Sequence, residues 1–197
     1  MKTICVYASG SKTLDQSYIK EAEMLGQLIA QRGYALVFGG GAHGLMGAVA
    51  RGAAQTGGRI IGVVPEIMNV NALLFDGCSE MHITSGMRER KALMEEKADA
   101  FIALPGGYGT LEELLEIITL RHLGVHQKPI AAVNTNGFYG GLAAQFDETV
   151  RLGFATEDAT SVYRICVNAQ EAMDYIASKD ASRPYIKNDL IKRSLGE

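Results

Sequence analysis

Residues 100–116, AFIALPGGYGTLEELLE, place a short apolar run directly before a glycine-rich loop and an amphipathic, acidic stretch. This order predicts a buried strand, a tight loop and the beginning of a helix. Similar apolar and β-branched runs recur along the chain, and most of them precede a helical pattern. These runs lie at 3–9, 35–40, 59–65, 129–135 and 163–167. Strands that alternate with helices in this way are typical of βαβ units.

The predicted fold is therefore of the α/β class, doubly wound, with a mostly parallel sheet that carries helices on both faces. Helices are expected at about 14–32, 45–55 and 85–97, whereas 66–84 is less regular. We expect a single domain over residues 1–178. Residues 179–197 lose the pattern and are expected to form a polar C-terminal tail.

The overall charge of the chain limits the kinds of partner to expect. Its 197 residues are 47% hydrophobic, which is enough for one well-buried domain. The formal net charge is −3, which creates no field that would attract nucleic acid or an anionic membrane. We expect neither as a partner. An anionic ligand would have to be bound locally, by backbone N–H groups or by a few well-placed cations.

The cysteines and the N-terminal segment indicate a cytoplasmic protein. Cys5, Cys78 and Cys166 are far apart and form no CxxC pair, which favours reduced thiols over a disulfide framework. The apolar run at 3–9 is too short for the core of a signal peptide. No stretch approaches the length of a transmembrane helix.

The predicted topology indicates where a ligand binds. In a doubly wound sheet, the strands at 3–9 and 100–105 would be central neighbours at the topological switch point. The loops that leave their carboxyl ends are 9–11 and 105–110, and the loop 39–44 opens on the same edge. Three loops of small residues would thus converge on one crevice.

The loop GGGAHG at 39–44 has two interpretations. Gly39, Gly41 and Gly44 match the spacing of a dinucleotide-binding fingerprint, with Glu66 as the acid for a ribose hydroxyl. The alternative is a tight strand-to-helix turn. A complete βα unit precedes the loop, whereas the fingerprint usually follows the first strand, so NAD binding is not favoured. Gly40 and Gly41 are candidate ligand-binding positions in either case.

The loop PGGYGT at 105–110 is more specific. Its glycines allow close approach of a ligand, and helix-start N–H groups at Gly109, Thr110 and Leu111 would point at an anion. No Lys-Ser/Thr follows, so this is not a nucleotide-hydrolysing P-loop. A structural alternative is a capping box in which Glu113 bonds back to the Thr110 N–H. A cap alone does not explain the run of glycines.

The segment SGMRERK at 85–91 gathers three cations within four residues. A charge run on a helix usually forms a solvated face. This helix, however, leads directly into the strand at 100–105, and Arg90 near the glycine loops could pair with a phosphate or a developing charge. The spacing of His122 and His126 lacks an acidic residue in the zinc-protease pattern, so no metal site is predicted.

The motifs GGGAHGLMG, MRERK and PGGYGTLEE, in this order and followed by LGVHQKPI, resemble the Lonely Guy family. The resemblance covers about residues 3–175. It implies a Rossmann-like fold, a homodimer with the site near the subunit interface, and no cofactor. The implied activity is cleavage of the N-glycosidic bond of AMP or of an N6-substituted cytokinin riboside 5′-monophosphate, which releases the base and ribose 5-phosphate.

The same resemblance assigns the site residues. It implies that Arg90 and Glu113 are the catalytic pair. The implied substrate-binding residues are Lys91, Gly107, Tyr108, Gly109, Thr110, Leu111, Glu112 and Thr119. The chain departs from the family pattern at Ser85, Gly86 and Arg88 and contains no tryptophan. These departures leave the catalytic pair intact and bear on base specificity.

The chemistry of these residues is compatible with that activity. Hydrolysis of an N-glycosidic bond passes through an oxocarbenium-like ribosyl centre, which a carboxylate can stabilise. Two further functions remain open at this point: a non-catalytic nucleotide carrier or sensor, and an NAD-dependent oxidoreductase. A pyridoxal phosphate-dependent lysine decarboxylase is disfavoured, because Lys91 is the one lysine within a motif and no partner for the ring nitrogen is evident.

Overall fold

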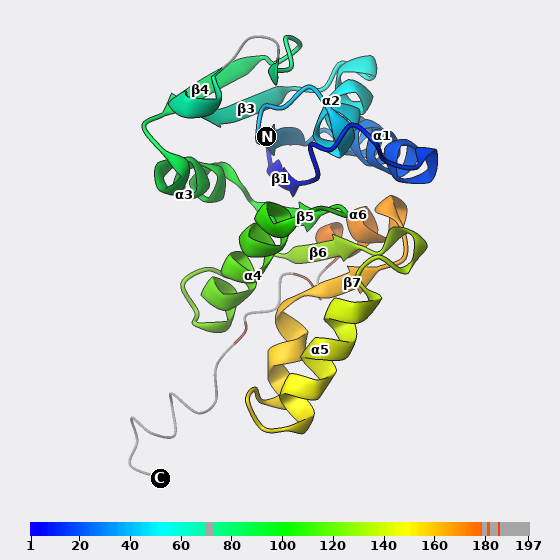
Figure 1. Ribbon diagram of the computed structural model, residues 1–197, viewed down its shortest axis with the longest axis vertical. Helices are drawn as coiled ribbons and strands as arrows, with labels where there is room; N and C mark the ends of the chain where they lie inside the picture. The colour runs from blue at the N-terminus through cyan, green and yellow to red at the C-terminus, as the bar shows by residue number, and fades with distance from the viewer. Residues whose placement is uncertain (70–72, 179–180, 182–184, 186–197) are drawn as a thin grey trace.

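A computed structural model describes residues 1–69, 73–178, 181 and 185, and within them the chain forms a seven-stranded sheet with the order β4-β3-β2-β1-β5-β6-β7. Every neighbouring pair of strands is parallel (Figure 1). The strands are β1 (Thr3–Tyr7), β2 (Ala35–Phe38), β3 (Ile60–Pro65), β4 (Glu80–Thr84), β5 (Ala100–Ala103), β6 (Ile130–Val133) and β7 (Arg164–Cys166). The doubly wound, Rossmann-like α/β fold is thus confirmed.

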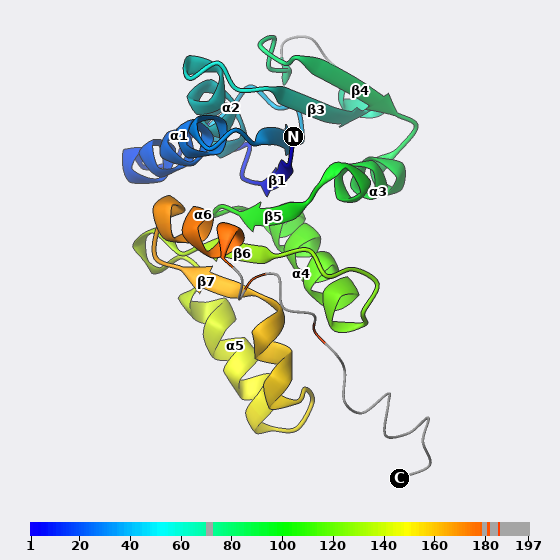
Figure 2. The ribbon, with the colours of Figure 1, turned by 180° about the vertical axis from the view of Figure 1, so that it is seen from behind.

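Helices cover both faces of this sheet (Figures 1 and 2). They are α1 (Gln16–Gln31), α2 (Gly44–Gln55), α3 (Met87–Lys97), α4 (Tyr108–His122), α5 (Gly140–Arg151) and α6 (Ala169–Ala177). Alternate residues of a strand face opposite sides of a sheet. Accordingly, Ile4 and Val6 of β1 pack in the core beneath α1, α2 and α6, whereas Cys5 and Tyr7 pack beneath α3 and α4.

Strand β4 is the element that the sequence did not predict. It lies within 66–84, the segment expected to be irregular, and pairs only with β3 at the edge of the sheet. Most of its residues are only partly buried, and Glu80 and His82 interrupt its apolar character. An edge strand with one partner does not require the continuous apolar run that marks the central strands.

The topological switch point lies where the sequence placed it. Strand β1 pairs with β2 on one side and β5 on the other, so the loops after these strands leave the same edge of the sheet. The Ser9 N–H donates to the Pro105 carbonyl at 3.3 Å, and the Leu45 N–H donates to the Ser9 carbonyl at 2.8 Å. These bonds tie the three loops together into one rim.

Two residues of the predicted C-terminal tail are described, and both pack against the domain. Ala181 and Tyr185 are buried. The buried Arg121 donates to the Ala181 carbonyl at 3.1 Å, and the Tyr185 N–H donates to the Gln127 side chain at 2.8 Å. The rest of the predicted tail, 179–180, 182–184 and 186–197, lies outside the described residues. Among the helices of the described part, none is long and apolar enough to cross a membrane.

Candidate active site

A buried ion pair joins helices α3 and α4 at the switch point. Arg90 donates through Nη1 to the Oε1 of Glu113 at 2.7 Å, and through Nε to the Val63 carbonyl at 3.2 Å. Both side chains are almost withdrawn from solvent, with 8% of each residue exposed. Arg88 of the same charge run is exposed. The prediction of a solvated charged face therefore holds for Arg88 and is wrong for Arg90.

The glycine loop after β2 makes room for this arginine. A Cβ added to Gly39 would lie 2.3 Å from the Arg90 Nη2 and 3.2 Å from the Met46 sulfur. Only a residue without a side chain lets the guanidinium reach Glu113 along this path. Gly40 has a φ of +73°, a conformation that favours glycine, and a Cβ added to it would lie 2.3 Å from a methyl group of Val64 rather than near Arg90. Gly41 forms an isolated bridge with Leu74.

The ion pair forms one wall of a cavity of about 320 Å³. Residues from all three predicted loops line it: Ser9 and Gly10, then Gly39, then Gly107, Gly109 and Thr110. Tyr7 and three methionines, Met46, Met68 and Met87, supply the rest of the wall together with the ends of the central strands. Of these methionines, Met46 belongs to the motif GGGAHGLMG and Met87 to MRERK, whereas Met68 lies outside the motifs singled out in the sequence. The predicted convergence of the loops is thus a real cavity.

Helix α4 begins earlier than a capping box requires. Its first residue is Tyr108 and its N-cap is Gly107, which makes no side-chain capping hydrogen bond. Thr110 lies inside the helix and Glu113 pairs with Arg90, so the predicted capping box is wrong. The Leu111 N–H donates to the Gly107 carbonyl at 3.0 Å, so its predicted role as an anion donor is wrong too.

The N–H groups that precede this first helical hydrogen bond, those of Tyr108, Gly109 and Thr110, have no acceptor within the helix. Gly109 and Thr110 line the cavity, and the positive end of the helix dipole favours an anion at this place. The Tyr108 side chain is 92% exposed at the same edge. This helix terminus offers local donors of the kind that a chain of net charge −3 would need to bind an anion.

A second ion-pair cluster lies beside the first. Lys91 contacts Glu112 and also the Glu116 carboxylate at 3.0 Å. These contacts, Glu112 first, raise the pKa of the Lys91 ammonium above its usual value. The structure thus brings together the predicted residues Lys91 and Glu112, next to Arg90 and Glu113.

Thr119 lies apart from this cavity. Its hydroxyl donates to the Leu115 carbonyl at 2.7 Å, and it lines a largely apolar groove of about 290 Å³ between α4, α5 and the short helix Glu157–Val162. Phe146 and Phe154 also line that groove. Within one chain, Thr119 is therefore not brought to the Arg90–Glu113 pair.

Burial controls the electrostatics of the ion pair. It raises the pKa of the Glu113 carboxyl above the ordinary 4.5, and the Arg90 guanidinium opposes that shift. A carboxylate held in this way is poised to stabilise a nearby positive centre.

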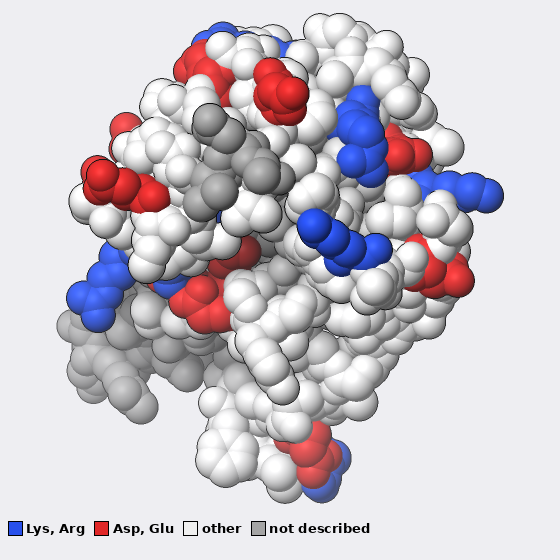
Figure 3. Space-filling model, turned by 45° about the horizontal axis from the view of Figure 1, so that its top comes forward, with Lys and Arg blue, Asp and Glu red and all other residues white. Residues whose placement is uncertain are grey.

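Within the described residues, no group of three or more His, Cys, Asp and Glu side chains could hold a metal ion. Basic and acidic side chains are interspersed over the face shown in Figure 3.

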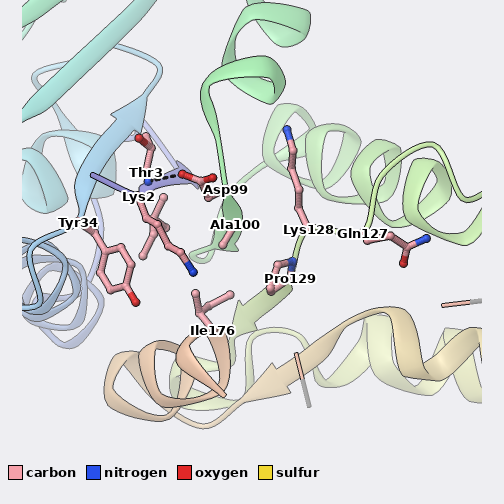
Figure 4. Close-up of a pocket in the computed structure, with 10 residues that line it drawn as sticks. Lys2, Thr3, Tyr34, Asp99, Ala100, Gln127, Lys128, Pro129 and Ile176 are labelled. Atoms are coloured by element: carbon pink, nitrogen blue, oxygen red, sulfur yellow. Dashed lines mark hydrogen bonds between the residues drawn. The ribbon is translucent and has the colours of Figure 1, made fainter. Parts of the chain in front are cut away.

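Another cavity, of about 290 Å³, lies at the opposite end of the central strands (Figure 4). Lys2, Tyr34 and Asp99 line it, and the Asp99 carboxylate accepts a hydrogen bond from the Thr3 N–H at 2.7 Å. The amine of Lys128 extends away from its centre in Figure 4 and donates to the Glu95 carbonyl. Ligands of open parallel sheets bind beyond the carboxyl ends of the strands, so the cavity with Arg90 and Glu113 is the candidate site.

Comparison with protein families gives a match over residues 46–176 to a family described as "possible lysine decarboxylase". The cytokinin riboside 5′-monophosphate phosphoribohydrolase LOG of Oryza sativa subsp. japonica is 42% identical over 190 residues, which span 96% of this chain and 77% of that protein. The corresponding LOG7 of Arabidopsis thaliana is 39% identical over 183 residues, spanning 93% of this chain and 83% of that protein.

Solved structures support the fold. A molybdenum cofactor binding protein from Rippkaea orientalis superposes with a TM-score of 0.68 at 24% identity, over 89% of this chain and 94% of that one. The molybdenum cofactor carrier protein of Chlamydomonas reinhardtii gives a TM-score of 0.68 at 21% identity, over 89% and 95%. At such low identity, this likeness concerns the arrangement of strands and helices alone.

Proposed function

Since the chain belongs to the Lonely Guy family, whose curated members include cytokinin riboside 5′-monophosphate phosphoribohydrolases, we propose that it hydrolyses the N-glycosidic bond of an adenosine 5′-monophosphate-type nucleotide. The products are the free base and ribose 5-phosphate. The observation that carries the proposal is the buried Arg90–Glu113 pair, which faces a cavity beside the free end of a helix.

In this proposal the 5′-phosphate binds at the beginning of α4. The N–H groups of Gly109 and Thr110 donate to it, and the helix dipole stabilises its charge. Gly107 and Gly109 have open space where a Cβ would stand, so the phosphate can approach the backbone closely. Binding of this remote group orients C1′ of the ribose toward Glu113.

The Glu113 carboxylate then stabilises the positive charge that develops on the ribosyl centre as the bond between C1′ and the base breaks. A water oxygen bonds to C1′, and the water proton that is released balances the proton taken up by the base. Arg90 favours the ionised form of Glu113, opposing the rise in its pKa that burial causes, and offsets negative charge on the leaving base.

The methionines of the cavity form the apolar side that we assign to the base. Met46, Met68 and Met87 are flexible and polarisable, so this wall can adapt to a flat purine or to a substituent on its N6. We therefore include both AMP and N6-prenylated AMP among the proposed substrates.

The description "possible lysine decarboxylase" fits the site less well. A pyridoxal phosphate enzyme needs a lysine that forms a Schiff base. Lys91, the lysine of the motif, is instead engaged by Glu112 and Glu116 on α4. The relatives that are about 40% identical over most of the chain carry the phosphoribohydrolase name.

A base-release assay tests the proposal. The protein is incubated with AMP and with N6-prenylated AMP, and the free base is measured by chromatography. Release of either base supports the function, whereas folded protein that releases neither contradicts it. Saturable nucleotide binding without turnover would instead indicate a carrier or sensor. A thermal-shift series with AMP, NAD and pyridoxal phosphate separates the ligand classes, because a ligand of the folded state raises the melting temperature.

We also propose that the protein is a homodimer whose interface includes the groove that contains Thr119. Helix α5, all of whose residues are described, buries none of them, and Phe154 at the groove is 83% exposed. A second copy on this face would cover these apolar side chains. Light scattering of the wild type and of Phe154→Glu measures the association: the variant should be monomeric, and a monomeric wild type would contradict the proposal.

The free thiols of the chain agree with a reducing compartment. Cys5, Cys78 and Cys166 form no disulfide with one another, and Cys5 and Cys166 are buried. We therefore propose a cytoplasmic location. Fractionation of the source cells with detection of the native protein tests it, and recovery outside the cytoplasm would contradict it.

A further inference from the structure

Three methionines from different parts of the chain meet at the candidate site. Met46 lies in α2, Met68 ends the short helix Glu66–Met68 after β3, and Met87 begins α3. We propose that Met68 and Met87 make the site sensitive to peroxide, and that their reversible conversion to methionine sulfoxide weakens nucleotide binding. This inference rests on the proposed function, since it concerns the same cavity.

Both residues are about half exposed to solvent. Met68 is 50% exposed and Met87 is 46% exposed, and each also lines the cavity. Met46 is more enclosed, because its sulfur and terminal methyl lie against Gly39 and Gly41. Peroxide from the solvent therefore reaches the outer two methionines before the inner one.

The cysteines of this chain are poor competitors for the oxidant. Peroxide attacks the thiolate rather than the thiol. Cys5 and Cys166 are buried, and burial raises the pKa of both thiols, that of Cys166 to about 12. Burial also raises the pKa of Cys78 to about 11. At neutral pH all three are protonated, so they do not intercept peroxide ahead of the exposed methionines.

The reaction itself is simple. The sulfur of methionine takes one oxygen atom from hydrogen peroxide, and water is released; the sulfur loses two electrons and the peroxide gains them. A methionine sulfoxide reductase with a thiol reductant returns the sulfur to the thioether. The modification therefore has the reversibility that a regulatory mark requires.

The consequence follows from the position of the two side chains. A sulfoxide oxygen is a strong hydrogen-bond acceptor, and it would stand in the apolar wall that we assign to the base. It also adds an atom to a cavity of about 320 Å³ that contains the Arg90 guanidinium. Burying an unpaired acceptor against the base, or drawing Arg90 away from Glu113, disfavours the bound nucleotide.

The test compares peroxide-treated and untreated protein. Peptide mass spectrometry follows each methionine and cysteine, and calorimetry measures AMP binding. We expect Met68 and Met87 to oxidise at least as fast as Met24, which is equally exposed at 50% but lies on α1 outside the cavity lining. The dissociation constant for AMP should rise by about tenfold. Treatment with the reductase should restore it.

Matched variants assign the effect. The double variant Met68→Leu/Met87→Leu should keep its own affinity for AMP after peroxide, whereas Met24→Leu should lose affinity as the wild type does. The inference is overturned if the cysteines oxidise first, if oxidised wild type binds AMP as before, or if the double variant remains sensitive. If the untreated protein releases base from neither AMP nor N6-prenylated AMP, the proposed function is overturned; this outcome is read from the untreated sample and is therefore distinct from failure of the peroxide effect.

Discussion

The guanidinium of Arg90 and the carboxylate of Glu113 lie 2.7 Å apart in the folded protein, although they are 23 positions apart in the chain. The pair is buried, so neither charge is solvated by bulk water. Removing one member of a buried ion pair leaves the other uncompensated and is costly. Each partner therefore helps to fix the position of the other at the edge of the cavity.

The substitution Glu113→Gln tests the role of the carboxylate. The amide keeps the shape but cannot stabilise a cation by charge, so kcat should fall by about 10²- to 10⁴-fold. Rates of base release, together with circular dichroism to confirm folding, measure the effect. The matched control is Glu96→Gln, an exposed position on α3, which should retain the wild-type rate. Full activity of folded Glu113→Gln would return this residue to a structural role.

The pH dependence of activity should reflect the same group. Burial raises the pKa of Glu113 above 4.5, and Arg90 opposes that shift. If the ionised form is required, kcat/KM falls on the acid side at a pH above the ordinary range of a glutamate. In Arg90→Met the acidic limb should move to still higher pH, because the favourable charge is lost. An acidic limb that does not move would contradict the pairing.

Gly39→Ala should disturb the site without altering its charges. The new Cβ would lie 2.3 Å from the Arg90 Nη2, so the guanidinium must move and its contact with Glu113 must weaken. We expect the rate of base release to fall about tenfold or more, corresponding to about 1.4 kcal/mol of lost transition-state stabilisation. Gly141→Ala, where no atom lies within 4 Å of the added Cβ, is the control. A crystal structure with Arg90 undisplaced would contradict the prediction.

We expect His126 to make the stability of the protein, rather than its catalysis, depend on pH. Its ring donates from Nε2 to the Ile117 carbonyl at 3.0 Å and accepts the Lys128 N–H at Nδ1. Burial lowers the pKa of His126 from 6.5 to about 4. Between these values the unfolded chain binds a proton that the folded chain does not, so the free energy of unfolding falls as the pH drops from about 6.5 to about 4.

Urea unfolding at several pH values measures this dependence. In His126→Gln the amide keeps a donor for the Ile117 carbonyl and does not titrate between pH 6.5 and pH 4. The part of the fall in the free energy of unfolding at acidic pH that comes from His126 should therefore disappear. His43→Gln is a matched control, since His43 is only partly buried, and it should retain the wild-type slope. An unchanged slope in His126→Gln would assign the acid sensitivity to other groups.

Local patterns predicted most of the fold. Helices cover both faces of the central strands, so nearly every residue of β1 and β5 is buried and the two runs are continuously apolar. Such a run can be recognised from the residue types alone. Strand β4 escaped prediction because an edge strand buries less and tolerates Glu80 and His82. The glycine loops were recognisable as candidate ligand-binding segments because the backbone conformations that they need are a local property of the sequence.

By itself, then, the sequence determined the parallel sheet, its switch point and the loops that meet there, since each depends on the period of apolar residues or on glycine at a turn. The tertiary structure alone decided which charges are buried and paired with one another. The spacing of Thr110 and Glu113 is equally suitable for a helix cap, and only the fold brings Arg90 to Glu113 in a space that Gly39 leaves open. Burial and pairing depend on residues distant in the chain, so no local pattern can reveal them.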